Sequence, residues 1–390
     1  MPTNPPRLKH LVLVGGGHSQ VAVIQHFARN PLPDCQITLI SADTAAPYSG
    51  MLPGWIAGQY TRDEMHIDLA RLCRFAHVRF FHGRVIALNL AEKHVYCQNS
   101  PPIPYDILSL NTGSTPPAIP DHPHVLPVKP VAAFIDKLDH LTKTLRDSPT
   151  PINIGIVGTG AAGFEVVLAV KRRLQASLSD SDLARIQLHL LGSAATVLPS
   201  HTRCVQKMAL DALKKANIAL HLNFRVEAVD TGFVQAKSGE TLTLDALIWA
   251  TGAAPAGWIA ESGLACDRKG FAIVGETLQS TSHPDVFITG DAASLTPIPV
   301  PKSGVFAVRE GPVLAQNLHR TLQRRPLKPY QPQRRFLSLL NTADGSAIAS
   351  RGPFAARGRL IGWWKDRIDR RFMRKYQLPP SQQTTHSEHE

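Results

Sequence analysis

The stretch LVLVGGGHSQVAVIQ, residues 11–25, decides the fold that this sequence predicts. An apolar run typical of a buried strand leads into three consecutive glycines, and an apolar stretch with helical character leads out of them. A turn of this kind either wraps the phosphate of a nucleotide or is a tight turn that requires small residues. Gln20 stands where the usual nucleotide-binding fingerprint has its third glycine, so the fingerprint alone does not decide between the two.

A second segment repeats the same order of elements. Residues 151–174 read PINIGIVGTGAAGFEVVLAVKRRL, and RIQLHLLGSA follows at residues 185–194. Both segments read strand, glycine turn, amphipathic helix and strand, which is the βαβ unit of a parallel sheet. Two such units predict an α/β fold with two Rossmann-like domains, each with its own nucleotide site.

In the first turn, glycines remain where the backbone must approach a phosphate. Gly15 permits the tight turn out of the strand, and Gly17 removes the Cβ that would obstruct a pyrophosphate. The helix that begins near His18 would direct its free N–H groups and positive dipole end toward that phosphate. Ser41 stands where an acidic residue usually binds the ribose, and it can still form one hydrogen bond.

The second turn satisfies all three glycine positions, with Gly158, Gly160 and Gly163. The strand before it and the helix after it supply the context that the motif requires. Gly192 and Ser193 stand where Asp or Glu would favour NAD, and no arginine stands directly there to favour NADP. The sequence therefore leaves the choice between NADH and NADPH open.

These features together resemble the two-dinucleotide-binding-domain flavoproteins of the pyridine nucleotide-disulfide oxidoreductase superfamily. The likeness rests on the two glycine turns, on two strands that end in Thr-Gly (residues 105–114 and 244–253) and on ITGDAA at residues 288–293. The resemblance implies that the first turn binds FAD and that the second, inserted domain binds NADH or NADPH. It also implies that Gly290 and Asp291 contact FAD.

Within that superfamily the chain is most similar to the type II NADH dehydrogenases, in particular to the NADH-dehydrogenase-like domain associated with selenophosphate synthetase. In that subgroup a bulky polar residue also replaces the third glycine, so Gln20 fits a phosphate-binding turn. The stretches that carry this likeness are GGGHSQVAV (15–23), PYSGMLPGWIAGQY (47–60), NTGSTP (111–116), PKSGVFAVREGPVLAQNL (301–318) and WWKDRIDRRFM (363–373).

The turns and the resemblance together define the expected site residues. The expected cofactor-binding residues are Gly15, Gly16, Gly17, His18, Ser19, Ser41, Ser49, Met51, Val85, Thr112, Gly113, Gly158, Gly160, Gly163, Gly252, Gly290, Asp291 and Gly304. The expected catalytic residues are Glu165, Lys302 and Glu310, and no metal site is expected. Glu165 matches a glutamate near the nicotinamide in relatives, although an acid that merely favours a helix N-terminus would give the same pattern.

Two of these expectations concern the helix that begins near Gly304. Its N-terminus, with Lys302, would stabilise negative charge at the flavin. Arg309 and Glu310 lie near where a quinone approaches in relatives, and a solvated ion pair is the alternative interpretation. Residues 47–51 would run beside the flavin, although Tyr48 and Met51 could equally belong to the core.

The cysteines narrow the expected reaction. Disulfide reductases of this superfamily need a cysteine pair beside the flavin, but residues 47–58 contain none. Residues 98–203 also lack the cysteines that the similar sulfide:quinone reductases need. The resemblance therefore implies an FAD-dependent NAD(P)H dehydrogenase that passes electrons directly to a quinone or a similar two-electron acceptor. The alternatives are a reductase for a soluble, selenium-linked acceptor and a non-catalytic redox regulator.

Positive charge gathers near the C-terminus. The chain has 390 residues and a net charge of +12, and residues 351–376 carry nine Lys or Arg residues against two Asp. Ile361, Trp364, Ile368 and Phe372 would share one face of a helix. Such a basic helix could lie on an anionic membrane surface, or its apolar face could pack on the protein body. No nucleic-acid-binding motif accompanies the charge, so nucleic acid is not an expected partner.

Domain boundaries follow from the order of these segments. The expected FAD-binding domain comprises residues 1–120 and 275–325, and the NAD(P)H-binding domain comprises residues 121–274. A small C-terminal subdomain would span 326–378, and 379–390 would be a disordered tail. With no apolar leader or membrane-spanning run, we expect a cytoplasmic protein, peripheral on the inner face of the membrane if the basic helix binds lipid. A homodimer remains one candidate for the oligomeric state.

Overall fold

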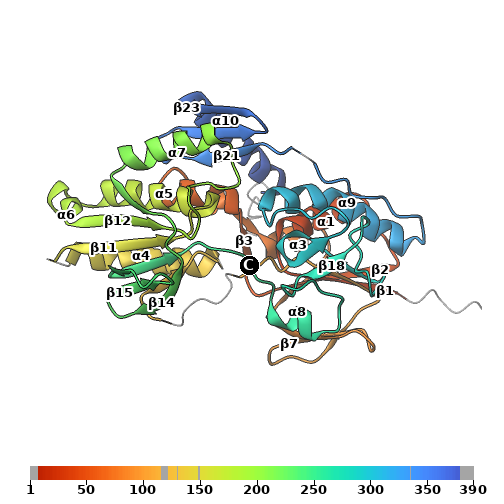
Figure 1. Cartoon of the computed structure of the whole chain (residues 1–390). Coiled ribbons are helices and arrows are strands. Elements are labelled where there is room, and N and C mark those ends of the chain that lie inside the picture. Colours follow the sequence, from red (N-terminus) through yellow and green to blue (C-terminus); the bar gives the residue numbers. More distant parts are fainter. Residues whose placement is uncertain (1–7, 116–121, 130, 148–149, 334, 378–390) are drawn as a thin grey trace, which may run out of the picture.

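Two five-stranded parallel sheets organise the structure, and each is built around one of the glycine-turn segments (Figure 1). The computed structural model describes residues 8–115, 122–129, 131–147, 150–333 and 335–377. In order across the first sheet, the strands are β19 (Val286–Ile288), β9 (Ile107–Leu110), β1 (Lys9–Val14), β2 (Cys35–Ser41) and β5 (Arg79–His82). In the second sheet they are β10 (Val125–Pro127), β17 (Ala246–Trp249), β11 (Ile152–Val157), β12 (Ile186–Leu191) and β13 (Ile218–His221).

The two sheets repeat one topology around their first βαβ unit. β1 lies between β9 and β2, and β11 lies between β17 and β12 in the same way. The two strands expected to end in Thr-Gly, β9 and β17, therefore occupy equivalent places. Because all these strands are parallel, the glycine turns and the Thr-Gly ends meet at one edge of each sheet. The expected α/β fold with two Rossmann-like domains is confirmed.

Helices cover these sheets because the strands are apolar on both faces. In the first domain, α1 (His18–Arg29) packs against α9 (Gly304–Leu322) and α3 (Leu69–Phe75). Gly311 allows the close crossing of α1 and α9, since a Cβ there would lie 2.8 Å from the Cβ of Ala22. The helices against the second sheet are α4 (Val131–Asp147), α5 (Ala161–Ser177), α6 (Asp180–Ala184) and α7 (Arg203–Lys215).

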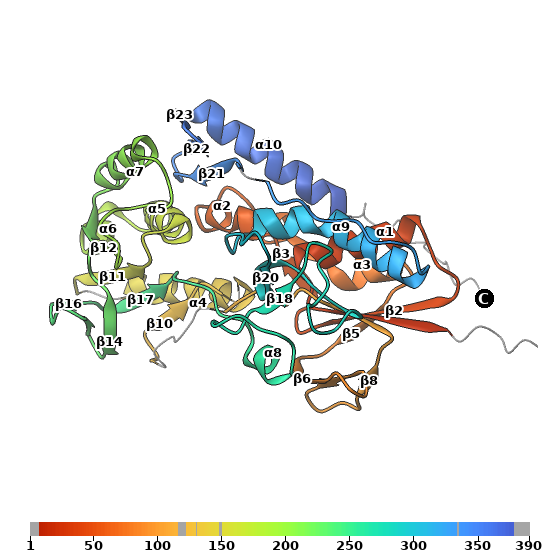
Figure 2. The same cartoon turned by 45° about the vertical axis from the view of Figure 1, so that its right-hand side comes forward.

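Several small antiparallel sheets and short helices accompany the two five-stranded sheets. The antiparallel pairings are β3 (Ala45–Pro47) with β4 (His66–Asp68), β6 (Val85–Asn89) with β7 (His94–Cys97) and β8 (Ile103–Pro104), and β14 (Val226–Asp230) with β15 (Phe233–Ala236) and β16 (Thr241–Thr243). The short helix α2 (Leu52–Ile56) contacts α5 of the second domain. At the C-terminal end, β21 (Ser338–Asn341), β22 (Ala347–Arg351) and β23 (Phe354–Gly358) lie beside α7, and α10 (Arg359–Tyr376) packs on these strands (Figure 2) and also contacts β4.

The chain passes between the two sheets at two adjacent segments. Thr115 and Ala254 form an antiparallel bridge, in which the Thr115 N–H donates to the Ala254 carbonyl at 2.8 Å. After this crossing, α8 (Gly257–Glu261) packs on β6, and β18 (Ala272–Val274) pairs with β20 (Ala293–Leu295). The segment after Ala254 thus already contacts β6, before the expected boundary after residue 274. The expected tail, residues 379–390, lies outside the described residues.

Candidate active site

The first glycine turn is packed so closely that side chains at its glycines would collide. Gly15 has a φ of +90°, and a Cβ on Gly17 would lie 2.0 Å from Oδ1 of Asn111. A Cβ on Gly16 would lie 2.3 Å from Leu69 and 3.3 Å from Oγ of Ser41, which places Ser41 beside the turn as expected. Glycine is therefore required at these positions so that the turn can pack directly against Asn111 and Leu69.

Gln20 remains inside the structure at the position of the missing glycine. Its side chain is fully buried, and Nε2 donates to the Ser109 carbonyl at 2.9 Å and to the Ser109 hydroxyl at 3.0 Å. The glutamine thus ties α1 to β9 by hydrogen bonds, where a glycine would let them pack more closely. A polar residue is tolerated here because β9 carries a serine opposite it.

Asn111 was not among the expected residues, yet it connects three strand ends. It follows β9, its Oδ1 accepts from the Ser19 N–H at 3.2 Å, and its Nδ2 donates to the Thr289 carbonyl at 2.9 Å. A Cβ on Gly290 would lie 2.6 Å from the same Nδ2. Asn111 therefore joins the turn after β1 to the Gly290–Asp291 turn after β19.

The Gly290–Asp291 turn is held from two sides. The Gly290 N–H donates to Oε2 of Glu310 at 2.6 Å. Oδ2 of Asp291 accepts from Nζ of Lys129 at 2.7 Å and from the Ser114 hydroxyl at 2.9 Å. Lys129 and Ser114 are further residues that sequence reasoning missed: no motif marks Lys129 after β10, and Ser114 lies in the quoted NTGSTP stretch but was not singled out.

The remaining expected residues of the first site lie around this edge. Ser49 and Gly304 approach each other, since a Cβ on Gly304 would lie 3.2 Å from Oγ of Ser49. Met51 is buried at the end of its short 3-10 helix, and Thr112 follows Asn111 with a buried hydroxyl. Gly113 adopts a φ of +70°. Val85 begins β6, two residues after Gly83, whose N–H donates to the Ser41 carbonyl at 2.9 Å, so it follows β5 at the same edge of the sheet.

The second glycine turn has the same construction at the edge of the second sheet. Gly158 has a φ of +125°, and a Cβ on Gly163 would lie 1.8 Å from the Gly158 carbonyl oxygen. A Cβ on Gly160 would meet no atom within 4 Å, so this glycine faces open space. Gly252, after β17, has a φ of +57°. The α5 N-terminus lacks a side-chain cap, which leaves backbone N–H groups for an anion, whereas in the first turn of α1 the Ser19 N–H is bonded to Asn111.

Two of the three expected catalytic residues occupy supporting positions. Glu310 is 2% exposed and bonds to the Gly290 backbone, so the alternative of a solvated ion pair with Arg309 is wrong. Burial raises the pKa of Glu310 to about 7. Nζ of Lys302 donates to the Ala293 carbonyl and lies 3.9 Å from the ring centre of Phe271, and burial lowers its pKa.

Glu165, the third expected catalytic residue, faces the C-terminal subdomain. Its Oε1 accepts from the Asn341 N–H of β21 at 2.6 Å. Burial raises the pKa of Glu165 to about 7, and the nearby Lys365 ammonium opposes this increase. The carboxyl group is thus shared between the second domain and the subdomain, which a plain helix-capping role does not explain.

α10 presents a polar, buried face to the first domain. Lys365 and Asp369 are 7% and 4% exposed, and Nζ of Lys365 donates to Oδ2 of Asp369 at 2.7 Å and to the Gly50 carbonyl at 2.9 Å. The Tyr48 hydroxyl is hydrogen-bonded to Asp369, and its ring stacks on Phe372 at 4.4 Å. Phe372 therefore belongs to the packed face, which corrects its expected place beside Trp364 and Ile368.

A cavity of about 530 Å³ opens where α10 meets β21, β22 and the segment after α2. Lys365 and Asn341 line it together with the aromatic rings of Tyr60 and Trp363. The other lining residues are Gln59, Gly345, Ser346, Arg359, Leu360, Gly362 and Asp366. Sequence reasoning treated Lys365 as surface charge, although its spacing of four from Asp369 is that of a helical ion pair.

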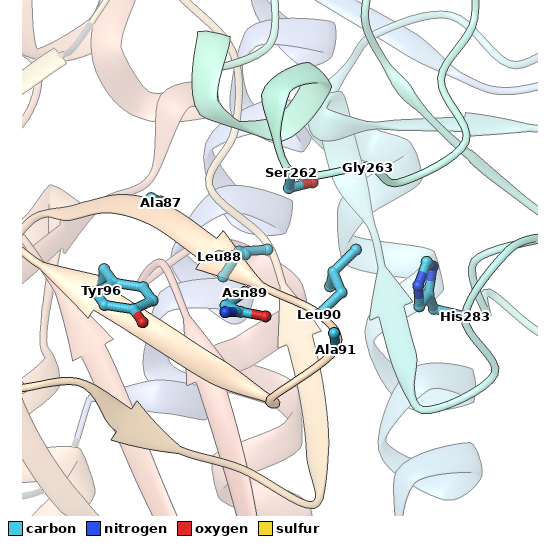
Figure 3. A pocket seen from close by; sticks show the side chains of 9 residues that line it. All are labelled: Ala87, Leu88, Asn89, Leu90, Ala91, Tyr96, Ser262, Gly263 and His283. Carbon is cyan, nitrogen blue, oxygen red and sulfur yellow. The ribbon is translucent and has the colours of Figure 1, made fainter.

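Another cavity, of about 540 Å³, lies between the β6–β7 hairpin and the end of α8 (Figure 3). Tyr96, Ser262 and His283 line it with backbone and apolar groups of residues 87–91. It contains none of the expected site residues, so the candidate active site lies along the two sheet edges and beneath α10.

Two sheets of one topology, each with a glycine turn at its carboxyl edge, define a two-site dinucleotide-binding oxidoreductase. The chain belongs to the pyridine nucleotide-disulphide oxidoreductase family, whose model matches residues 9–317. The expected cofactors, FAD and NADH or NADPH, are those of this family.

Similar proteins support the resemblance to NADH dehydrogenases. The NADH dehydrogenase-like protein YutJ of Bacillus subtilis is 23% identical over 87% of this chain and 91% of its own length. The type II NADH:quinone oxidoreductase of Haemophilus influenzae is 27% identical over 54% of this chain and 50% of its own length. Among solved structures, NDH2 of Plasmodium falciparum in complex with NADH aligns with a TM-score of 0.79 at 14% identity, covering 94% of this chain and 97% of that one.

The first site fits FAD on its own geometry. The three glycines let the turn pack directly against Asn111 and Leu69, and Ser41 lies beside it. Nε2 of His18 and Oγ1 of Thr112 are buried there without a hydrogen-bond partner among the described residues. A polar ligand at this edge would satisfy such groups.

Glu310 makes a testable contribution to pH-dependent stability. Because its pKa in the folded chain is about 7, the folded state binds this proton more tightly than the unfolded state, whose pKa is near 4.5. Stability from this group is therefore complete below about pH 4.5 and is lost as the pH rises through 7. We expect the free energy of unfolding, measured in urea at pH 5, 6 and 7, to fall with rising pH by about 1–3 kcal/mol less in Glu310→Gln than in the wild type. Glu276→Gln, an exposed site, should keep the full decline, and an unchanged decline in Glu310→Gln would contradict the assignment.

Proposed function

We propose that this protein is an FAD-dependent NAD(P)H dehydrogenase that passes electrons to a quinone or a similar two-electron acceptor. The observation that carries the proposal is the Lys365–Gly50 hydrogen bond, which ties the wall of the α10 cavity to the loop beside the first glycine turn. A compartment for an acceptor thus adjoins the expected cofactor site. The names of the similar type II NADH:quinone oxidoreductases support the same reaction class.

Each of the two glycine turns would bind a different nucleotide. Gly15–Gly17 and Ser41 would hold FAD, with Gly290 and Asp291 kept in place by Glu310 and Asn111. Gly158–Gly163 would hold NAD(P)H at the second sheet. When bound, FAD supplies the chemistry that couples a two-electron donor to an acceptor. The protein supplies position and a fixed electrostatic environment.

The cysteines support direct transfer to the acceptor. All five cysteines are free in the structure, and Cys73 and Cys97 are buried. Burial raises the pKa of Cys73 to about 12 and also raises that of Cys97, so neither is a thiolate at neutral pH. None of the five lies in residues 47–58 beside the first turn.

The cavity under α10 suits a quinone-like ring. Its volume lies within the range of small-molecule sites, and Tyr60, Trp363 and Leu360 provide apolar walls. Reduction of a quinone by NAD(P)H consumes one proton from water in addition to the donated hydride. Lys365 lies at the inner wall of the cavity, and its hydrogen bond to Asp369 at 2.7 Å fixes the orientation of its amine. Lys365 would therefore deliver this proton to the acceptor oxygen.

The outer face of α10 would place this cavity at an anionic membrane surface. Leu360, Trp363, Trp364 and Ile368 are 82%, 61%, 39% and 39% exposed. The exposed cations along the same helix are Arg359, Arg367, Arg371, Arg374 and Lys375. Aromatic anchors flanked by basic residues are typical of helices that lie in a lipid interface. Among the described helices, none is both long and apolar enough to cross a bilayer.

Anaerobic spectroscopy tests the dehydrogenase proposal. NADH or NADPH should remove the visible absorption of the purified yellow protein, and a short-chain quinone should restore it. The double variant Lys365→Met/Asp369→Leu removes both buried charges together, because one charge left alone would be costly. We expect quinone reduction to fall at least about tenfold, while ferricyanide, which takes electrons without protons, is reduced within about twofold of wild type.

The matched control is Asp182→Leu/Arg185→Met, which removes an ion pair at the surface of the second domain. This variant should reduce both the quinone and ferricyanide at the wild-type rate. A protein that neither nucleotide reduces would refute the dehydrogenase proposal. Equal losses with quinone and ferricyanide would refute the role of Lys365.

Liposome flotation tests the membrane surface. Trp363→Ser/Trp364→Ser should weaken binding to anionic vesicles at least about tenfold, since two aromatic anchors are lost. Phe75→Ser/Ile298→Ser changes two exposed apolar residues elsewhere and should bind as wild type does. Truncation of α10 is a poorer test, because it also removes Lys365 and Phe372. Undiminished flotation of the tryptophan variant would reject this surface.

A further inference from the structure

His18 is the first residue of α1 and follows the glycine turn directly. Its imidazole lies in an aromatic cluster, 5.3 Å from the Tyr48 ring and 5.7 Å from the Phe372 ring. Phe372 comes from α10, so this cluster joins the glycine turn to the C-terminal helix. The ring is thus held in a defined orientation by two neighbours that offer no strong hydrogen-bond acceptor to it.

Nε2 of His18 is buried and has no hydrogen-bond partner among the residues that the structure describes. A buried polar group without a partner has lost its hydrogen bonds to water and gained none in return, which destabilises the protein. Such groups in folded proteins usually face a ligand, an ion or an ordered water. The direction in which this nitrogen faces therefore indicates what satisfies it.

The nitrogen faces the start of α9. A Cβ built on Gly304 would lie 3.8 Å from Nε2 of His18 and 3.2 Å from Oγ of Ser49. Ser49 and Gly304 come from separate parts of the chain, and both are expected to bind FAD from their motifs. The α9 N-terminus has no side-chain cap, so its free N–H groups face the same place. Three elements thus converge around one point beside the glycine turn.

We propose that the imidazole of His18 donates a hydrogen bond from Nε2 to bound FAD and so contributes to the affinity of the protein for the cofactor. FAD offers acceptors along its whole length, namely the pyrophosphate, the ribityl hydroxyls and the pyrimidine carbonyls of the flavin. Burial lowers the pKa of His18 to about 4, which keeps the ring neutral with one N–H to donate. This inference rests on the proposed function only through FAD, and it does not depend on the acceptor.

The test compares two histidines of the same helix. His18→Phe keeps the aromatic contacts with Tyr48 and Phe372 but removes the donor. His26→Phe is the matched control, because His26 also has a buried Nε2 without a partner among the described residues and packs on Phe27 at the other end of α1. The measurements are the FAD dissociation constant, from the fluorescence of released flavin, and the flavin absorption spectrum.

We expect His18→Phe to raise the FAD dissociation constant about two- to tenfold, the value of one hydrogen bond, and to shift the absorption bands. The loss should be the same at pH 6 and pH 8, because the ring is neutral at both. His26→Phe should match wild type. Wild-type affinity and spectrum in His18→Phe would overturn the inference, even if quinone reduction succeeded. Conversely, failure of quinone reduction with an intact His18 effect would refute only the proposed function.

Discussion

Close approach of backbone to backbone at the first glycine turn is the constraint on which the rest of the structure depends. Gly17 leaves no room for a side chain because Oδ1 of Asn111 occupies that space, and Asn111 also reaches Thr289. One amide therefore fixes three strand ends relative to one another. Glu310 completes the arrangement from α9 by accepting from Gly290. The cofactor edge is thus shaped by buried polar contacts as well as by apolar packing.

α10 combines two roles that usually exclude each other in a surface helix. Its inner face carries a buried ion pair, Lys365 with Asp369, and an aromatic contact through Phe372, while its outer face exposes Trp363 and Leu360. A buried ion pair is weak evidence for stability, because desolvation offsets most of its attraction. Its presence beside the cofactor loop is better explained by a function in charge or proton placement.

The sequence was sufficient for the parts of the fold that depend on local pattern. Buried strands and glycine turns have a fixed spacing, so both sheets and the start of α9 could be predicted. Lys365 and Asn111 could not, because their roles depend on contacts with residues far away in the chain, such as Gly50 and Thr289. Phe372 was misplaced because an apolar stripe does not reveal which neighbour covers it. The alternative of a solvated ion pair at Glu310 was wrong, because a charge in a helix is usually solvated but this one is buried against the Gly290 backbone.

The paired crossing segments at Thr115 and Ala254 have a mechanical consequence. Two antiparallel segments joined by backbone hydrogen bonds cannot easily twist or slide relative to each other, but both can bend in the same direction. Relative movement of the two domains would then follow a single opening and closing axis. The Glu165–Asn341 hydrogen bond adds a separate connection between the second domain and the C-terminal subdomain, so a movement of the second domain would either break this bond or carry β21 along.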